Sequence, residues 1–217
     1  MQKSINCLLF CFVSFWLFSC NQCDEKQSGY YKFTPQELQI NPYYGHEVIL
    51  FQNLSGDSLH FSAGDRISNM IQVYPNHEDE CKGNYYWLET NNIVISSNSN
   101  SWQFSITLTS TPTATSNIYD KVIAFEASIP AQRKKTLSDA NLLFERDTIT
   151  GYMYNYTDLF FHTSLTLGLK SFTDVYEIKL FRSDGNVEYW VNKIYYTIKL
   201  GIVGFSTQQN DLWYLDK

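Results

Sequence analysis

The residues best suited to bind a metal ion lie in one acidic segment, His77-Glu78-Asp79-Glu80-Cys81. Imidazole, carboxylate and thiolate groups are common zinc ligands, but consecutive residues on one loop rarely converge on one ion. None of the chain's four histidines forms a metal-spaced pair with another on one predicted element. The spaced oxygen ligands and the glycine of an EF-hand are also missing. We therefore expect a solvated turn here, with no metal and no other cofactor.

Hydroxyl groups that could act as nucleophiles lack an activating context. Ser164 and Ser206 do not lie in a nucleophile-elbow pattern, and the chain has no glycine loop that would hold a phosphate. We therefore expect a protein that is not an enzyme. The alternative is an enzyme whose acidic side chains meet only in the fold, where two buried carboxylates would face each other in a cleft.

The N-terminal segment predicts export. Lys3 precedes a largely apolar stretch over residues 5–18, which is shorter than the about 20 residues that a membrane-spanning helix needs. The stretch ends at Leu17-Phe18-Ser19-Cys20, which resembles the lipobox of bacterial lipoproteins, although Phe18 is bulkier than the usual residue. The resemblance implies that residues 1–19 are a signal peptide and that Cys20 carries two or three acyl chains, enough for a durable membrane anchor. The alternative is an ordinary secretory peptide with an incidental cysteine.

The residues after Cys20 are acidic and polar. Residues 21–26, with Asp24 and Glu25, resemble the surface-export signal of Bacteroidota lipoproteins. This resemblance implies an outer-membrane protein on the cell surface, whereas a solvated linker with chance acids would leave periplasmic exposure open. The composition predicts a flexible tether over residues 20–29 and a single β domain over residues 30–217.

Charge limits the partners. Removing residues 1–19 changes the formal net charge from −6 to about −7, because Lys3 is the only charged residue removed. Nucleic-acid recognition needs a basic stripe, so no nucleic-acid partner is expected. Contact with the membrane is expected through the lipid anchor.

Two cysteines remain once the signal is removed and Cys20 is lipidated. Cys23 and Cys81 could form a disulfide, because disulfides persist in exported proteins. A bridge would require their Cα atoms to lie within about 7 Å. Two free thiols are the other interpretation.

Alternation of apolar and polar residues predicts an all-β fold. The aromatic content is 17%, and over residues 102–109 every second residue is apolar. Gly201 and Gly204 would suit a bulge or a sharp coil that bends a strand. We therefore expect a curved antiparallel sheet, as a half-barrel or sandwich, with at most one short helix, which would begin at Ser138 and end near Arg146. Two hairpins are predicted, one joining residues 47–52 to 58–63 and one turning at residues 183–186. Further strands are predicted at residues 85–89, 93–96, 122–128, 151–156, 160–169, 194–200, 202–205 and 212–215.

The C-terminal segment resembles the ending of uncharacterised Bacteroidota outer-membrane lipoproteins. The shared pattern is a Gly-Ile-Val-Gly-Phe element at residues 201–205, followed by a short strand with Trp213 and Leu215. The family implies no reaction. Some members resemble the curved sheet of lipoprotein carriers, which is an analogy of fold alone.

Two triplets resemble the acid-hydroxyl-aliphatic acceptor of O-linked glycans in Bacteroidota. They are Asp57-Ser58-Leu59 and Asp147-Thr148-Ile149. The resemblance implies modification of Ser58 and Thr148, which would have to be exposed at a turn or at a strand end.

The function expected from these features is that of a non-catalytic, membrane-anchored envelope lipoprotein. Its sheet would present a surface to a protein or glycan partner, and tyrosine-rich stretches near residues 152–156 and 189–196 could stack on sugars or belong to the core. The alternative is a carrier that shelters a lipid or other apolar ligand in the curved sheet, although small barrels are usually filled by their own side chains.

Overall fold

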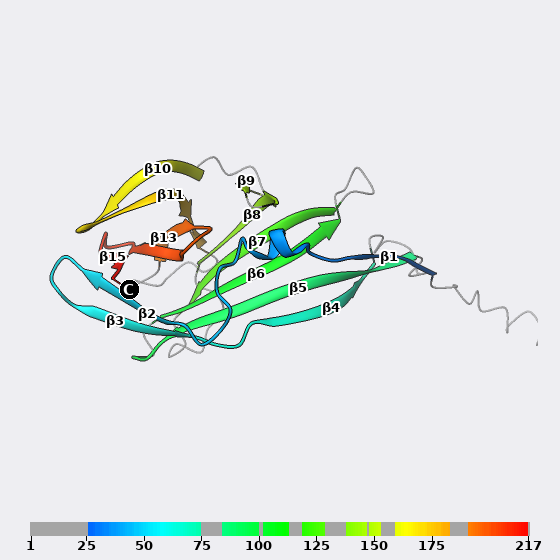
Figure 1. Cartoon of the computed structure of the whole chain (residues 1–217), viewed down its shortest axis with the longest axis horizontal. Helices are drawn as coiled ribbons and strands as arrows, with labels where there is room; N and C mark the ends of the chain where they lie inside the picture. The colour runs from blue at the N-terminus through cyan, green and yellow to red at the C-terminus, as the bar shows by residue number, and fades with distance from the viewer. Residues whose placement is uncertain are drawn as a thin grey trace, which may run out of the picture. The chain divides into compact units, whose positions relative to one another are not determined.

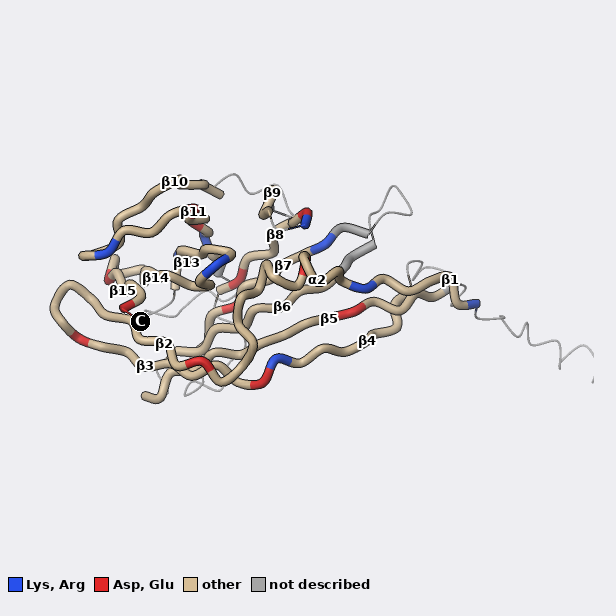
Figure 2. Tube along the Cα trace, viewed as in Figure 1, with Lys and Arg blue, Asp and Glu red and all other residues tan. Residues whose placement is uncertain are grey.

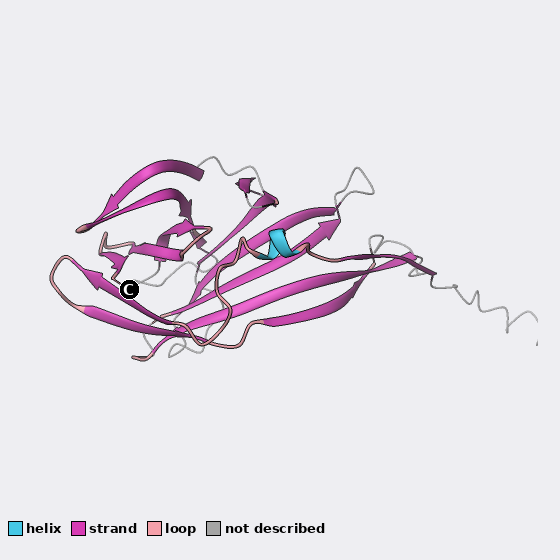
Figure 3. Cartoon of the chain, in the orientation of Figure 1, coloured by secondary structure: helices cyan, strands magenta, loops and turns pink. Residues whose placement is uncertain are grey.

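A computed structural model describes residues 26–74, 84–99, 102–112, 119–128, 138–146, 148–152, 159–182 and 191–216. Antiparallel strands make up most of this part of the chain, and its one helix, α2 (Pro35–Leu38), has four residues (Figure 3). The all-β prediction is therefore confirmed. The signal peptide, Cys20, Cys23, Cys81 and the acidic segment at residues 77–81 lie outside the described residues.

The strands follow one another closely along the chain. Their bounds are β1 Lys26–Tyr31, β2 Val48–Asn53, β3 Ser58–Ala63, β4 Ile67–Val73, β5 Asn84–Ser97, β6 Gln103–Pro112, β7 Tyr119–Ser128, β8 Ser138–Glu145, β9 Thr148–Tyr152, β10 Leu159–Leu167, β11 Lys170–Lys179, β12 Phe181–Arg182, β13 Val191–Thr197, β14 Gly201–Thr207 and β15 Leu212–Leu215.

The strands form one sheet that nearly closes on itself. Its order is β10-β11-β13-β14-β15-β2-β3-β5-β6-β7-β8-β12, while β1 and β4 pair with β5 and β9 pairs with β8. Figure 1 shows the β2–β3 and β10–β11 hairpins of this sheet. Leu180 alone links β11, near one end of this order, to β12 at the other end, where Phe181 lies opposite Asp139 of β8. This crossing gives the sheet a barrel-like form.

Contacts divide the chain into two compact units. One comprises Met1–Tyr30 and Gln72–Trp87, and the other comprises Tyr31–Ile71 and Leu88–Lys217. The barrel-like sheet and its core belong to the second unit. Because β1 begins at Lys26, residues 26–29 of the expected tether are part of a strand.

The inner face of the sheet is filled by side chains. Phe51, Phe61, Phe104 and Phe205 are all fully buried, and their ring centroids lie 5.1–6.3 Å apart. All of these pairs except Phe61–Phe104 meet edge to face, which is a favoured geometry of aromatic rings. On β6 the predicted alternation is confirmed, because Phe104, Ile106 and Leu108 are buried while the residues between them are half-buried.

The predicted helix at Ser138 is wrong, because residues 138–145 form strand β8. The burial of these residues alternates, with Ala140, Leu142 and Phe144 facing the core, and β8 pairs with β7 on one side. Tertiary packing of this period-two face overrides the weak local helix signal.

One predicted hairpin is confirmed, and the other has a different register. In β2–β3, Val48 lies opposite Ser62 and Gln52 opposite Ser58. A turn at residues 183–186 would place Ile178 opposite Val191, but Ile178 lies opposite Ile194, because the chain leaves β11 to pair with β8. Residues 183–190 themselves lie outside the described part.

The predicted bulge between Gly201 and Gly204 is confirmed. Tyr195 lies opposite Gly204 and Tyr196 opposite Ile202, so Val203 is an extra residue on β14. A Cβ atom on Gly204 would lie 2.8 Å from the carbonyl oxygen of Trp213. Glycine is therefore needed where β14 bends against β15.

Candidate binding cleft

A cleft of about 600 Å³ opens in the second unit beside the turn between β13 and β14. Three parts of the chain line it: the segment between β1 and β2, the β10–β11 hairpin and the β13–β14 turn. The lining residues are Gln39, Pro42, Tyr44, Phe161, Thr173, Asp174, Tyr176, Thr197, Ile198, Lys199 and Leu200. We call residues 33–44 the strap, because this segment contributes one wall of the cleft and is bound to the sheet along its length.

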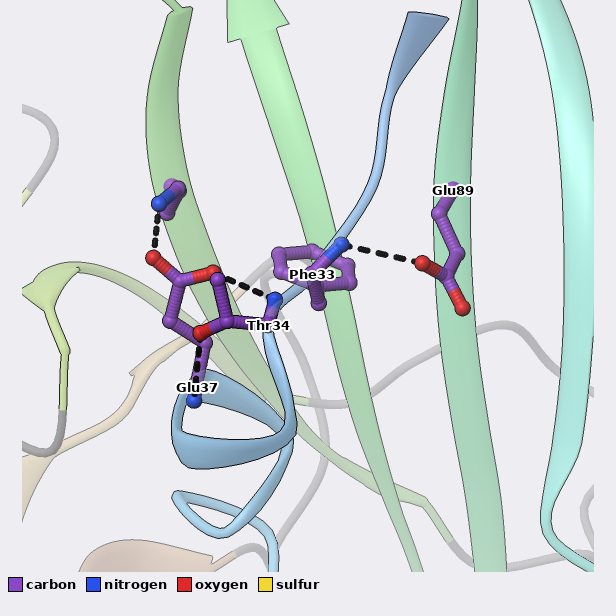
Figure 4. Close-up of polar contacts among 5 residues, drawn as sticks. Phe33, Thr34, Glu37 and Glu89 are labelled. Atoms are coloured by element: carbon purple, nitrogen blue, oxygen red, sulfur yellow. Dashed lines mark hydrogen bonds and ion pairs between the residues drawn. The ribbon is translucent and has the colours of Figure 1, made fainter.

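Carboxylates fix the beginning of the strap. Glu37 Oε2 accepts a hydrogen bond from the Thr34 backbone N–H at 2.7 Å, and Thr34 Oγ1 accepts one from the Glu37 N–H at 3.2 Å. This capping box explains why α2 begins here, with Pro35 in its first turn. Glu89 of β5 accepts from the Phe33 N–H at 2.9 Å, so carboxylates on two elements bind consecutive backbone groups (Figure 4).

Glu37 is also paired with Lys121 of β7. The Glu37 side chain is 6% exposed, so burial opposes its charge, but hydrogen bonds from Lys121 and Thr34 outweigh this effect. The pKa of Glu37 in the folded protein is therefore lower than its ordinary value. The ion pair joins the strap to the sheet.

Replacement of Glu37 with Gln is expected to lower the free energy of unfolding by about 1–2 kcal/mol near neutral pH. Gln can keep the bond to the Thr34 N–H, so the loss reports the charge paired with Lys121. A lowered folded-state pKa contributes stability above the ordinary value of 4.5, and that stability disappears as the pH falls through the folded pKa. Urea unfolding should therefore show the two proteins converging below pH 4.5. A difference that is independent of pH would contradict this account.

Arg66 fixes the end of the strap. Its guanidinium donates to the carbonyl oxygens of Leu38, Asn41 and Tyr43 at 2.8–3.1 Å, and its Nε donates to Asn91 Oδ1 at 2.7 Å. Burial lowers the pKa of Arg66 from its ordinary value, although guanidinium groups stay charged in proteins. One cation therefore satisfies three carbonyls that would otherwise lack donors.

Two buried tyrosines complete the attachment. The Tyr196 hydroxyl donates to the Ile40 carbonyl, and the Tyr43 hydroxyl accepts from the Ile202 N–H at 2.8 Å. Both tyrosines are at most 4% exposed, and burial raises the pKa of each. The strap is thus held to β13 and β14, and this positions Tyr44 at the cleft.

Aromatic rings form the walls of the cleft. Tyr44 is 77% exposed and Phe161 is 53% exposed, whereas Tyr176 is buried. The rings of Phe161 and Tyr176 have centroids 5.1 Å apart, and the Arg66 guanidinium lies 5.9 Å from the Tyr44 ring centroid. Tyr44 and Phe161 therefore each contact a neighbouring side chain, Arg66 and Tyr176 respectively, while part of each ring faces solvent.

Polar groups surround the rings. Asp174 and Lys199 are exposed, as are Gln39 and Thr173. Asp174 has a φ of +54°, a left-handed conformation that Asp tolerates better than most residues. This conformation lets Phe172, before Asp174, and Val175, after it, join the same second core cluster, while Tyr176 faces the main core. The same kink places Asp174 in the cleft.

A separate polar cluster lies on β10, β11 and β13. Glu177 Oε2 is 3.1 Å from His162 Nε2, and Glu177 Oε1 is 2.5 Å from Lys193 Nζ. Burial, together with the Glu177 charge, raises the pKa of Tyr195. The cluster contains one carboxylate, whose two oxygens contact Lys193 and His162.

Two acidic residues lie opposite each other in the sheet between β7 and β8. Glu126 and Asp139 are directly opposite each other, and burial raises the pKa of Asp139. Glu126 is exposed, so this is not the pair of buried carboxylates in a cleft that an acid-base enzyme would need. In the described ranges no group of three His, Cys, Asp or Glu residues could hold a metal ion.

The predicted acceptors for glycans both lie at strand ends. Ser58 is the first residue of β3 and Thr148 the first residue of β9, and both are exposed. The Asn53 side chain donates a hydrogen bond to Asp57 Oδ2 and accepts one from the Asp57 N–H, both at 2.9 Å. These bonds order the turn before Ser58. The required exposure is present, and modification of Ser58 and Thr148 stays a prediction.

The cleft combines three segments that the sequence alone did not bring together. Only the strap had a local sequence signal, the capping sequence Thr34-Pro35-Gln36-Glu37.

No family model, no curated protein and no solved structure matches this chain. Among the described residues no helix is long and apolar enough to cross a membrane.

Proposed function

We propose that this chain is a non-catalytic, lipid-anchored protein of the outer membrane that binds a glycan in the cleft. The observation that carries the proposal is the pair of exposed rings, Tyr44 and Phe161, next to the exposed polar side chains of Asp174, Lys199 and Gln39. Sugar rings present C–H faces that stack on aromatic rings, and their hydroxyls need nearby donors and acceptors. A volume of about 600 Å³ lies in the usual range of small-ligand sites.

The filled interior of the sheet supports a ligand held at the cleft. Inward-facing side chains of the described strands form the main core cluster, which includes the buried ring of Tyr176. A lipid carrier would instead need open volume among these side chains. We therefore place the ligand against the exposed rings rather than inside the sheet.

Substitution of the exposed rings tests glycan binding. Tyr44→Ala and Phe161→Ala should each weaken binding of an envelope oligosaccharide about tenfold, because each removes one stacking surface worth about 1.4 kcal/mol. Leu54→Ala is the matched control, since Leu54 is 70% exposed and does not line the cleft. Binding should be measured by calorimetry after an oligosaccharide screen.

The screen has two results that would overturn a glycan ligand. One is that no oligosaccharide binds. The other is that a protein from the envelope binds instead and loses affinity with Tyr44→Ala and Phe161→Ala, which would assign the cleft to a protein partner.

The lipid anchor rests on the lipobox resemblance at residues 17–20 and is tested separately. Labelled palmitate should appear on the chain and should be absent from the Cys20→Ala variant. Globomycin should slow processing of the precursor. Protease treatment of intact cells should then degrade a surface-exposed domain and spare a periplasmic one.

A further inference from the structure

The first unit carries a group of aromatic side chains separate from the cleft. Tyr74 and Tyr85 have ring centroids 5.9 Å apart, and those of Tyr85 and Trp87 are 6.3 Å apart. Tyr30, on β1, is 61% exposed, and β1 pairs with β5, the strand that carries Tyr85 and Trp87. We call Tyr30, Tyr74, Tyr85 and Trp87 the aromatic patch. All four belong to the same compact unit.

Few charged side chains lie among the described residues of the unit that carries the patch. Among the described residues of this unit, Lys26 is the one charged side chain, and it lies on β1 (Figure 2). Tyrosine and tryptophan combine an apolar ring with one polar group, and they concentrate at the interface between a bilayer and water for that reason. The composition of the patch therefore suits the headgroup region of a membrane.

The short distance along the chain from Cys20 to β1 would bring the patch near a membrane. Residues 21–25 separate Cys20 from the start of β1 at Lys26. An extended segment of this length spans about 20 Å at most, since each residue adds about 3.3–3.6 Å. Lipid on Cys20 would thus keep β1, the strand of Tyr30, close to the bilayer surface.

We infer that the aromatic patch inserts into the headgroup region of the bilayer and orients the chain on the membrane. The inference rests on the proposed lipid anchor at Cys20. The acidic residues Asp24 and Glu25 and the acids at 78–80 are close to the patch in sequence and disfavour anionic headgroups. The contact is therefore made by rings with zwitterionic lipid, not by charge.

Fluorescence quenching tests the contact directly. The lipidated chain is placed in phosphatidylcholine vesicles whose acyl chains are brominated near the headgroup, because bromine quenches tryptophan at short range. Quenching is expected for the wild type and should be lost in Trp87→Phe. Trp102→Phe, which changes a ring packed on the core of the second unit, should keep it. Quenching that is unchanged in Trp87→Phe would overturn the inference.

A second measurement separates failure of the patch from failure of the anchor. Lipidated chain that floats with the vesicles but shows no Trp87 quenching would leave the anchor intact and disprove the patch. If Cys20 carries no lipid, the mature Cys20→Ser chain tests the patch alone at high vesicle concentration. A Tyr30→Ser, Trp87→Ser variant of that chain should bind about tenfold more weakly, with Leu54→Ser as the control. Binding that disappears in molar salt, or that is equal in both variants, would contradict contact through rings.

Discussion

Arg66→Met should lower the free energy of unfolding by about 3–5 kcal/mol, which is a large part of the stability of a typical domain. The substitution leaves the carbonyl oxygens of Leu38, Asn41 and Tyr43 without the donor that now satisfies them. Each buried group left unpaired costs about 1–3 kcal/mol, and partial access to water reduces the sum. Methionine keeps most of the apolar length of the side chain, so the measured loss reports the hydrogen bonds.

Two control variants sharpen the Arg66 experiment. Arg66→Lys should recover little stability, because an ammonium group cannot reproduce the planar set of donors that reaches four acceptors. Arg146→Met changes an exposed arginine and should have an effect below about 0.5 kcal/mol. Urea unfolding gives all three values. A loss for Arg66→Met as small as that for Arg146→Met would show that the strap is held by its other contacts.

The strap also explains why stability and binding should change together. Gln39, Pro42 and Tyr44 line the cleft from the strap, and Arg66 binds the carbonyl oxygens of residues 38, 41 and 43. Arg66 itself is not among the residues that line the cleft. A weaker ligand affinity in Arg66→Met, measured where the protein is still folded, would therefore reflect positioning of Tyr44.

The fold could be predicted from sequence because the signal is local. Alternation along β6, and over Tyr176 and Ile178 at the end of β11, specifies which face is buried whatever strand lies beside it. The order of the strands could not be predicted in this way. β2 pairs with β15 at the other end of the chain, so that Phe51 lies opposite Leu215. Nothing in either segment alone encodes that partner.

The site was harder to predict than the fold for the same reason. Tyr44, Phe161 and Lys199 are far apart in sequence and meet because the sheet order brings β10, β11 and the β13–β14 turn to the strap. Arg66 precedes β4 without any motif, and its role depends on carbonyls more than twenty residues away. The bulge at Gly201 and Gly204 was predictable, because glycine pairs in a strand have a local conformational meaning.

Gly201→Ala should destabilise the protein by about 3–5 kcal/mol for two separable reasons. Gly201 has a φ of +80°, where an alanine is strained by about 1–2 kcal/mol. A Cβ atom at this position would lie 2.3 Å from the ring of Tyr43, so the ring would have to move. Movement would break the bond from the Ile202 N–H to the Tyr43 hydroxyl and would add overpacking of about 1–3 kcal/mol.

Gly56→Ala separates these two contributions to the loss at Gly201. Gly56 has a φ of +89°, but no atom lies within 4 Å of its Cβ position. Its substitution should therefore cost only the backbone strain, about 1–2 kcal/mol. Combining Gly201→Ala with Tyr43→Ala should give a loss smaller than the sum of the single losses, since the smaller side chain removes the clash. Equal losses at Gly56 and Gly201 in thermal and urea unfolding would mean that the Tyr43 ring moves away from the added methyl group with no loss of stability. The strap would then be held less firmly against β14 than its hydrogen bonds indicate.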